Sequence, residues 1–368
     1  MKALPIRAVQ MFAILALAIG IKNHVIIVPL ILNAAMRDAW ISAILAIPLV
    51  LLWAAAVHKL MKLLNKESLY GWFSSRYNKL VACFVIMPLV LMLVMSLYIT
   101  VRDSCTWTKV TYLPKTPFFV TVTLFVLASM AGAMKGLRTI AIASGLLLPG
   151  VILFGLFVMS VNFQFKDYSY LLPILTKGFN PVVRGTLYVL SGAVEMIIVL
   201  AFVPYIKGHM KLWSLCLGVI AITGLVFGPL IASIAIFGPY EAWDQRYPAF
   251  EQWRMVLIGK FISHLDFLSI YQWLSGALIR ISLAMFLVVD LLGLSSHKLK
   301  NVWLFALSAA LIYSVAGIHM SDATFFSVLQ NVYYPIMSVF FYAFPFLLLA
   351  LAYLKRRSSA HATESRGN

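Results

Sequence analysis

A charged and polar pentapeptide at residues 20–24, Gly-Ile-Lys-Asn-His, interrupts the first apolar stretch of the chain. Largely apolar sequence runs over 8–19 and resumes over 25–32, which places Lys22 near the depth where the hydrocarbon of a bilayer is thickest. A lysine at that depth costs about 2.5–3.5 kcal/mol on insertion scales and marks a functional position by default. This one feature therefore constrains both the fold and the role of the first span.

A second interruption of the same kind occurs about 170 residues later, as expected for a chain built from two related halves. Residues 191–195, Ser-Gly-Ala-Val-Glu, interrupt the apolar stretch 182–206, and Glu195 brings a charge of the opposite sign. Interrupted apolar segments at corresponding positions of two halves are typical of transporter folds with a binding site at the bilayer midplane. The pattern therefore predicts a small-molecule site where the two interruptions meet.

The composition is that of a membrane protein. The 368 residues are 62% hydrophobic and 11% charged, and their mean hydropathy is +0.95, whereas soluble domains are about 45–50% apolar and about 25% charged. Repeated apolar runs of about 18 residues or more predict a polytopic, all-α membrane protein. The net charge of +17 lies mostly in short connections beside these runs, which indicates topology determination and no nucleic-acid partner.

Ten apolar stretches predict about ten transmembrane helices in one domain, 1–357, followed by a polar cytoplasmic tail, 358–368, that we expect to be disordered. Five stretches precede residue 175 and five follow it. An odd number per half gives the two halves, 8–161 and 182–354, opposite orientations, which is the condition for an inverted repeat. The predicted spans are 8–35, 40–60, 80–101, 117–134, 138–161, 182–206, 212–237, 267–290, 301–318 and 332–354.

Lysine and arginine are unevenly distributed between the two sides of this arrangement. With both termini inside, 17 of them fall in inside segments and 10 in outside segments. Because positive residues favour the cytoplasmic side, both termini are predicted to be cytoplasmic. The longest polar connection, 237–266, then lies outside, and its helix-like apolar spacing suits a segment that covers the entrance.

No pattern in the sequence indicates catalysis. The chain lacks a phosphate-binding Gly-Lys loop, a metal-spaced His/Cys cluster and a plausible nucleophile–base pair. Cys83, Cys105 and Cys216 are odd in number and fit no metal spacing, which favours a packing role for them. We therefore expect neither an enzyme nor a metal or other cofactor.

The two interruptions offer complementary ends to a ligand. A helical half beginning near Asn23 would direct its positive end at a carboxylate, and the carbonyl ends near Gly20 and Ser191 suit an ammonium group or a cation. A zwitterionic amino acid fits such a pair of ends, and the alternative is a kink filled by neighbouring helices. The candidate ligand-binding residues are Gly20, Ile21, Lys22, Asn23, Tyr98, Ser191, Gly192, Glu195 and Arg280.

Three charges are expected inside the membrane, and each allows more than one role. If the interrupted helices pack together, Lys22 and Glu195 form an ion pair in which Lys22 substitutes for a coupling cation, or the pair is purely structural. Arg280 holds Glu195, a substrate carboxylate or helix-end carbonyls, or has a structural role alone. Tyr98 either lines the site with its polar tip or packs.

Three stretches of the chain carry a family resemblance. They are 172–181 (LPILTKGFNP), 237–242 (FGPYEA) and 247–254 (YPAFEQWR), the last running on through 259–266 (GKFISHLD). In these motifs, their order and their spacing, the chain resembles the B-subunit family of bacterial spore nutrient-germinant receptors. That family is a branch of the amino acid–polyamine–organocation transporter superfamily.

The resemblance implies a LeuT-like fold, in which a 5+5 inverted repeat has helices 1 and 6 broken. It also implies a subunit that binds a small-molecule germinant, often an amino acid or sugar, and that assembles with a membrane A subunit and a lipoprotein C subunit in the spore inner membrane. Ligand binding would then trigger ion release and germination. One departure is Lys22, which stands where the family's first break usually has a second glycine. Either the ligand differs, or Lys22 fills part of the pocket, or the copy is constitutive or has lost nutrient binding.

Three functions remain open on the sequence. The leading one is a germinant-sensing receptor subunit. The same fold also suits an ion-coupled amino-acid symporter, whose ligand crosses the membrane, and a scaffold subunit, whose pocket is vestigial. Accumulation of labelled amino acid by vesicles that hold only this chain would separate the symporter from the sensor.

Overall fold

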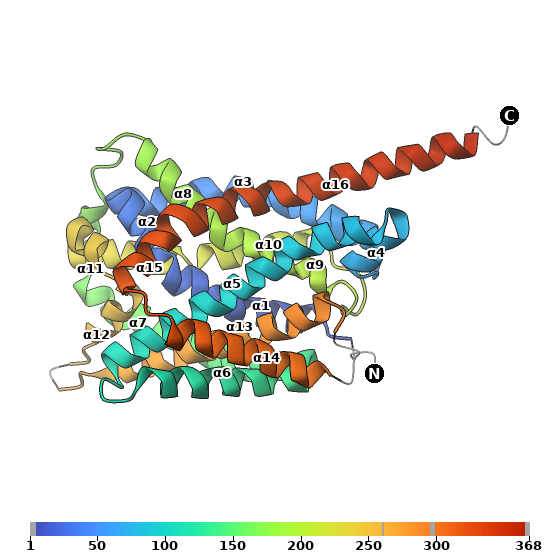
Figure 1. Cartoon of the computed structure of the whole chain (residues 1–368). Helices are drawn as coiled ribbons and strands as arrows, with labels where there is room; N and C mark the ends of the chain where they lie inside the picture. The colour runs from blue at the N-terminus through green and yellow to red at the C-terminus, as the bar shows by residue number, and fades with distance from the viewer. Residues whose placement is uncertain (1–4, 260, 295–298, 365–368) are drawn as a thin grey trace.

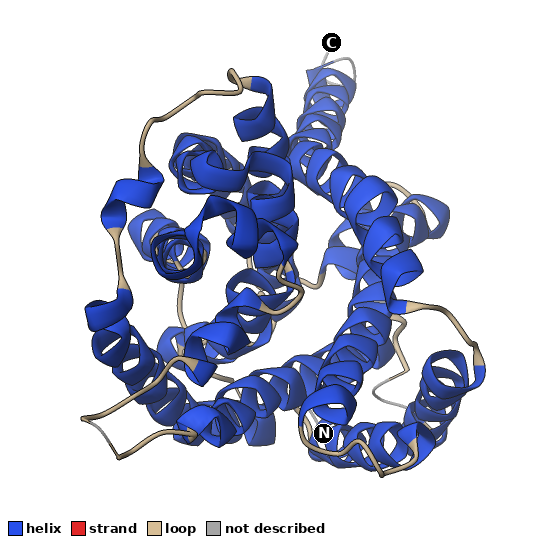
Figure 2. Cartoon of the chain, turned by 90° about the vertical axis from the view of Figure 1, so that its left-hand side faces the viewer, coloured by secondary structure: helices blue, strands red, loops and turns tan. Residues whose placement is uncertain are grey.

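The regular structure of the chain is helical (Figure 1). The computed structural model describes residues 5–259, 261–294 and 299–364. Within these ranges the only other regular pairing is two isolated bridges, Ile6 to Ile206 and Ile258 to Ile262. Figure 2 views the helices nearly along their length, as a bundle. The all-α class predicted from the composition is confirmed.

Nine helical segments of the described chain are long and apolar enough to cross a membrane. The first, Ala8–Leu64, has 57 residues, and at about 1.5 Å per residue it is far too long for one crossing of about 30 Å. It is divided at Met36, whose φ of 48° lies outside the right-handed helical region, so it contains the first two predicted spans. The other segments are Lys79–Thr111, Phe118–Lys135, Leu137–Phe165, Asn180–Phe202, Leu212–Asp244, Leu265–Leu291, Lys300–Gly317 and Asp322–Leu354.

The first interruption, which we expect to be a break, is instead a wound segment of altered pitch. Helix α1 (Ala8–Ile21) passes into a π-helical segment, η1 (Lys22–Ile26), before α2 (Val28–Ala35). Ile27 N–H donates to the carbonyl of Lys22 at 3.0 Å, so the backbone groups remain paired, as a membrane interior requires. The second half of this helix therefore begins at Val28 rather than near Asn23. Single π turns inside α-helices are frequent at functional sites.

The second interruption is also wound, but tighter than an α-helix. Helix α8 (Asn180–Ala193) passes into a 3₁₀ segment, η5 (Val194–Ile198), and then into the short α9 (Val199–Phe202). Glu195 lies in the first turn of η5. A stretch of 3₁₀ inside a helix often marks a functional hinge or a strained sequence. Both interruptions predicted from the sequence are therefore irregular in the structure, although neither is unwound.

The remaining helices surround these two. They are α3 (Ala39–Leu64), α4 (Leu69–Arg76), α5 (Lys79–Thr111), α6 (Phe118–Lys135), α7 (Leu137–Val161), α10 (Leu212–Gly224), α11 (Phe227–Asp244), α12 (Pro248–Arg254), α13 (Leu268–Leu291), α14 (Lys300–Ile312), α15 (Asp322–Val328) and α16 (Tyr334–Glu364). A π-helical segment, η8 (Leu329–Tyr333), joins α15 to α16.

The interrupted helices lie in the interior of the bundle. The segment Asn180–Phe202 is almost entirely buried, whereas only a small share of Leu137–Phe165 is buried. Helix α1 packs against α13 and α7, and α8 packs against α3, α2 and α16. Charged groups on such central helices are surrounded by protein rather than lipid, which allows neighbouring side chains and carbonyls to stabilise them.

The C-terminal helix leaves the bundle. Helix α16 runs on to Glu364 and projects beyond the other helices in Figure 1. It therefore continues into the tail 358–368, for which we predict disorder, and residues 365–368 lie outside the described residues.

Candidate functional site

A buried charge cluster lies where the two interruptions meet, and it consists of Lys22, Glu195 and Arg280. Lys22 Nζ lies 2.9 Å from Glu195 Oε2, and Arg280 Nη2 lies 2.6 Å from Glu195 Oε1. The side chains of Lys22 and Glu195 are 2% and 4% exposed, and that of Arg280 is 6% exposed. The predicted ion pair of Lys22 and Glu195 is confirmed, and Arg280 is a second cation on the same carboxylate.

The ammonium group of Lys22 has two further partners. It donates to the carbonyl of Ser191 at 2.8 Å, and it lies 5.0 Å from the centroid of the Tyr334 ring. The Ser191 carbonyl is one of the helix-end groups that we expect to suit a cation. In the structure Lys22 occupies that position with its own positive charge.

Arg280 connects four elements of the fold. From α13 it donates through Nε to Thr100 Oγ1 of α5 at 2.8 Å and through Nη1 to the carbonyl of Ala18 of α1 at 2.6 Å. Its third contact is Glu195 of η5. Of the roles considered for Arg280, the structure shows binding to Glu195 and to a helix carbonyl.

Two cations share one carboxylate in this cluster. Among the described residues, Glu195 is the only acidic side chain within ion-pair distance of Lys22 or Arg280. A buried charge is stabilised only when it is paired and hydrogen-bonded, and the cluster meets this condition contact by contact. It nevertheless carries an excess positive charge, which a carboxylate-bearing ligand would balance.

Gly192 brings the two interruptions into direct contact. A Cβ atom added at Gly192 would lie 2.0 Å from Asn23 Oδ1 and 2.8 Å from Ile27 Cδ1, so only glycine fits here. Asn23 cannot easily move away, because it is fully buried and its Nδ2 donates to the carbonyl of Ile222 at 2.8 Å. Asn23 Oδ1 is buried without a hydrogen-bond partner among the described residues.

The structure thus brings together six of the nine predicted site residues, namely Lys22, Asn23, Ser191, Gly192, Glu195 and Arg280. Tyr98 does not join them. It is partly buried and packs edge-to-face on Phe325 of α15, with the ring centroids 6.3 Å apart.

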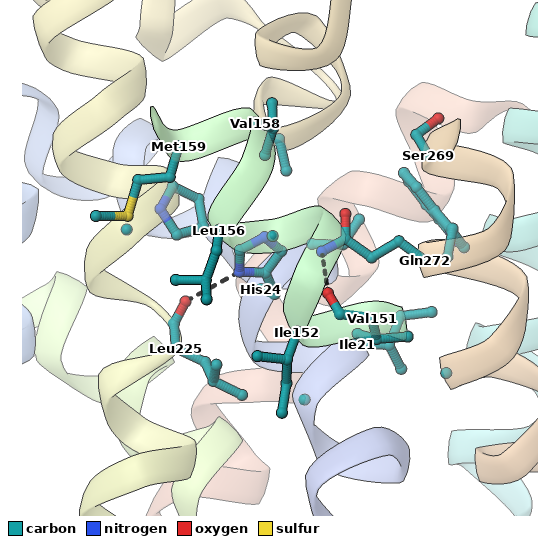
Figure 3. Close-up of a pocket in the computed structure, with 18 of the residues that line it drawn as sticks. Ile21, His24, Val151, Ile152, Leu156, Val158, Met159, Leu225, Ser269 and Gln272 are labelled. Atoms are coloured by element: carbon teal, nitrogen blue, oxygen red, sulfur yellow. Dashed lines mark hydrogen bonds between the residues drawn. The ribbon is translucent and has the colours of Figure 1, made fainter. Parts of the chain in front are cut away.

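Gly20 and Ile21 face a cavity instead of the charge cluster. The cavity measures about 500 Å³ and is bounded by α1, η1, α7, α10, α11, α12 and α13. His24 also faces it, as Figure 3 shows, and donates from Nδ1 to the carbonyl of Leu225 at 3.2 Å. Consecutive residues of η1 and its approach therefore serve two sites, with Lys22 and Asn23 on one side and Ile21 and His24 on the other.

Two residues of α5, Thr100 and Ser96, contact the charge cluster but are not among our predictions. Thr100 accepts from Arg280, as described above, and donates to the carbonyl of Ser96 at 2.7 Å. Ser96 Oγ lies 3.5 Å from Glu195 Oε1. Two hydroxyl residues four positions apart in an otherwise apolar span share one helix face, and this spacing is the signal that would have identified them.

A second ionic site, the Arg246 clasp, lies at the end of the bundle where α12 is found. Arg246 Nη2 lies 2.6 Å from Asp103 Oδ1, and Arg246 Nε lies 3.0 Å from Asp322 Oδ2. Burial opposes the charge on Arg246, but Asp103 and Asp322 outweigh it and raise the pKa of the guanidinium above its usual value. The clasp therefore joins α5, the connection after α11 and the start of α15 through a permanently charged group.

The fold and this site define a polytopic helical membrane protein with a buried charge cluster between two irregular central helices. Comparison with known proteins narrows the class, because residues 6–323 match the family model described as spore germination protein. The chain belongs to the spore germination protein family, which confirms the resemblance seen in the sequence motifs.

Two relatives illustrate the match. The chain is 38% identical to spore germination protein XB of Bacillus anthracis over 347 residues, which cover 94% of this chain and 97% of that protein. It is 24% identical to the putative spore germination protein YfkT of Bacillus subtilis (strain 168) over 289 residues, which cover 75% of each chain. The similarity to the first relative therefore extends over almost the full length of both proteins.

Proposed function

We propose that this chain is the B-type, germinant-sensing subunit of a spore germination receptor. The observation that carries the proposal is the charge cluster of Lys22, Glu195 and Arg280, which lies at the contact of the two irregular central helices. Buried ionisable residues inside a membrane protein are costly, and they mark ligand or ion sites by default. The family membership supplies the context of germination.

The fold that we propose is a 5+5 inverted repeat of the LeuT type. Two features support it: the irregular segments η1 and η5 lie at corresponding positions of the two halves, and the ion pair of Lys22 and Glu195 joins them, beside the close approach of Asn23 to Gly192 in the last turn of α8. Substrate sites of such folds lie at the repeat interface near the midplane. A ligand site at this contact agrees with the sequence prediction for helices 1 and 6.

The cluster suits a zwitterionic ligand such as an amino acid. A ligand carboxylate would pair with Lys22 and Arg280, and a ligand ammonium would take the place on Glu195 and the Ser191 carbonyl that Lys22 leaves when it turns to that carboxylate. Lys22 takes the part of a cation in this account. Displacing its ammonium from two acceptors changes the contact between η1 and η5, and that difference between bound and unbound states is what a sensor needs.

We propose an assembly of the kind that the family resemblance implies. The chain would lie in the spore inner membrane with both termini on the core side, beside a membrane A subunit and a lipoprotein C subunit. It would pass a conformational signal to these partners instead of moving nutrient in bulk. An amino-acid symporter of the same fold is the competing function, and a scaffold with a vestigial pocket is the third.

The test uses spores that carry this chain with its partner subunits. A nutrient screen should find a compound that triggers germination, and Lys22→Met should raise the nutrient concentration for half-maximal response at least tenfold. Lys22 is the preferred target because Glu195 keeps Arg280 when Lys22 is removed. The control is Lys62→Met, a substitution of the same type at an exposed position of α3.

Three results would contradict the proposal. A nutrient response that is unchanged in Lys22→Met spores, at equal protein level, removes the cluster from sensing. Accumulation of the labelled nutrient by vesicles that hold this chain alone supports the symporter. A screen in which no nutrient acts, while cluster substitutions alter only the amount of assembled receptor, supports the scaffold.

A further inference from the structure

We infer that the cavity beside η1 is a second binding site, which takes a small uncharged ligand with an apolar body and one hydrogen-bond donor. It is distinct from the charge cluster, and no residue of the cluster lines it. Its volume of about 500 Å³ falls within the range of about 300–1,000 Å³ that is usual for small-molecule sites.

The lining of the cavity excludes charged ligands. It contains no Asp, Glu, Lys or Arg side chain, and most of its residues are aliphatic or aromatic, including Phe250, Trp253 and Trp273. A free amino acid would leave its carboxylate and its ammonium without partners there, and burying unpaired charges is very costly. The cavity therefore selects a different ligand class from the one that suits the charge cluster.

The polar groups of the cavity are few, and most are already engaged. Gln272 donates from Nε2 to the carbonyl of Val151 at 3.3 Å (Figure 3). It also accepts from Trp253 Nε1 at 3.1 Å. Gln252 donates to the Pro229 carbonyl and to Ser233 Oγ. These contacts fix the walls and leave little capacity for a ligand.

His24 is the polar group best placed to receive a ligand. Its Nδ1 must be the donor toward Leu225, because a carbonyl oxygen only accepts. In the neutral imidazole the other nitrogen, Nε2, is then an acceptor. Among the described residues no group donates to His24 Nε2, and the ring lies amid the lining side chains in Figure 3. The ligand is therefore expected to bring one O–H or N–H donor.

Glycines keep the cavity open. Gly224 and Gly228 line it at the junction of α10 and α11, and a Cβ atom added at either would meet no other atom within 4 Å. Larger side chains at these two positions would therefore occupy the cavity without displacing the fold. Gly145 of α7 has the same open surroundings but does not line the cavity, so it provides a matched control.

Helix α13 links this site to the charge cluster. Gly276 lines the cavity and Arg280 of the cluster lies four residues later, one turn along the same helix. Ile21 and His24, which line the cavity, are likewise close in sequence to Lys22 of the cluster. Binding to the cavity does not depend on the proposed sensing function, and only an effect of that binding on sensing would rest on it.

The experiment measures binding directly, with the full chain in phospholipid nanodiscs and indole as the probe. Indole is uncharged, apolar and carries one N–H donor. We expect indole to raise the unfolding temperature of the chain, with a Kd that Gly228→Leu increases at least tenfold and Gly145→Leu leaves unchanged. Should Gly228→Leu fail to fold, Gly224→Leu serves the same purpose.

Two further comparisons test the ligand chemistry. Tryptophan, which carries the same ring on a zwitterion, should bind at least tenfold more weakly than indole. N-methylindole, which lacks the donor, should also bind about tenfold more weakly, and His24→Phe should abolish this difference between the two indoles. A merely structural role for His24 would lower both affinities equally.

Several outcomes would overturn the inference. They are the absence of any shift with indole, an equal shift in Gly228→Leu, or an equal shift with tryptophan. Native mass spectrometry supplies one more: a phospholipid that is retained by the unmodified chain, lost from Gly228→Leu and not displaced by indole would make an acyl chain the occupant. These binding results are independent of the germination response of Lys22→Met spores, so either proposal can fail alone.

Discussion

Arg280 Nη2 lies 2.6 Å from Glu195 Oε1, and this contact joins α13 to the irregular segment of the second half of the chain. The same carboxylate holds Lys22 of the first half at 2.9 Å. Glu195 is thus the single anion on which both halves and a third helix converge. Since each of these side chains is buried, the contacts act in a medium of low dielectric, where pairing matters most.

Removing the carboxylate should be strongly destabilising. Glu195→Gln leaves Lys22 and Arg280 buried with no anion, and breaking a buried pair in this way costs about 3–5 kcal/mol. We expect a fall of that size in the free energy of unfolding, measured by denaturant titration of the purified chain in detergent. Glu251→Gln breaks a partly exposed pair with Arg254 and should cost less than about 1 kcal/mol. Equal losses in the two variants would contradict this account of the cluster.

Arg280 should not tolerate lysine. The guanidinium reaches Thr100, Ala18 and Glu195 at once, whereas a lysine ammonium has no planar fork with which to keep all three. Arg280→Lys is expected to lose about 1.5–3 kcal/mol of unfolding free energy, the usual value of a hydrogen bond to a charged group. Arg138→Lys, at an exposed position of α7, is the matched control and should change nothing measurable. The measurement is again the free energy of unfolding from denaturant titration. A cost below about 0.5 kcal/mol would show that Arg280 is dispensable for the cluster.

Gly192 should resist even the smallest enlargement. Gly192→Ala places a methyl group against Asn23 and Ile27 and should separate η1 from the end of α8, at a cost of about 1–3 kcal/mol for overpacking. Gly145→Ala, in open surroundings within α7, should instead be neutral or stabilise by up to about 1 kcal/mol, because alanine favours the helix. Thermal unfolding of both variants checks the pair. An unfolding temperature of Gly192→Ala equal to that of the unmodified chain would contradict the close contact between η1 and the end of α8.

The charges inside the spans could be predicted from the sequence. That Lys22 and Glu195 would lie together followed from the free-energy cost of an unpaired charge inside the membrane. Lys22 and Glu195 interrupt apolar stretches, and unpaired charges are not tolerated at that depth. Their pairing therefore needed only the assumption that the two interrupted helices touch. Arg280 was open to several roles because its position on one span does not determine which neighbours it meets.

Other parts of the site depended on packing that the sequence does not encode locally. Tyr98 and Thr100 lie two residues apart on α5, and only the rotation of that helix decides that Thr100 meets Arg280 while Tyr98 meets Phe325. Segment η1 stays helical because backbone N–H and C=O groups inside a membrane must remain hydrogen-bonded. This requirement outweighs the break that the polar residues suggest.

The cavity and the Arg246 clasp were missed for a related reason. The cavity walls come from several helices that are distant in sequence, so no single stretch of sequence predicts the cavity. Arg246 counted only as one of the positive residues that set topology. Asp103, two residues after the end of the predicted span 80–101, was the available signal for a partner.

The two carboxylates of the Arg246 clasp should differ in their contribution. Asp103 is 1% exposed in its side chain and Asp322 is 41% exposed, although both bind the same guanidinium. Asp103→Asn should therefore lower the free energy of unfolding by about 1.5–3 kcal/mol, whereas Asp322→Asn should cost less than about 1 kcal/mol because solvent screens the pair. The comparison is made by denaturant titration under one set of conditions. A larger loss in Asp322→Asn than in Asp103→Asn would contradict the burial of Asp103.

The most direct test of the central claim is the equilibrium binding of the active nutrient to the purified receptor, compared between the unmodified chain and Lys22→Met. If the charge cluster is the sensing site, Kd should rise about tenfold or more in Lys22→Met, in line with the loss of one hydrogen bond to a charged group, and should be unchanged in Lys62→Met. An unaltered Kd in Lys22→Met, in protein that folds and assembles normally, would place the nutrient elsewhere and would contradict the proposal.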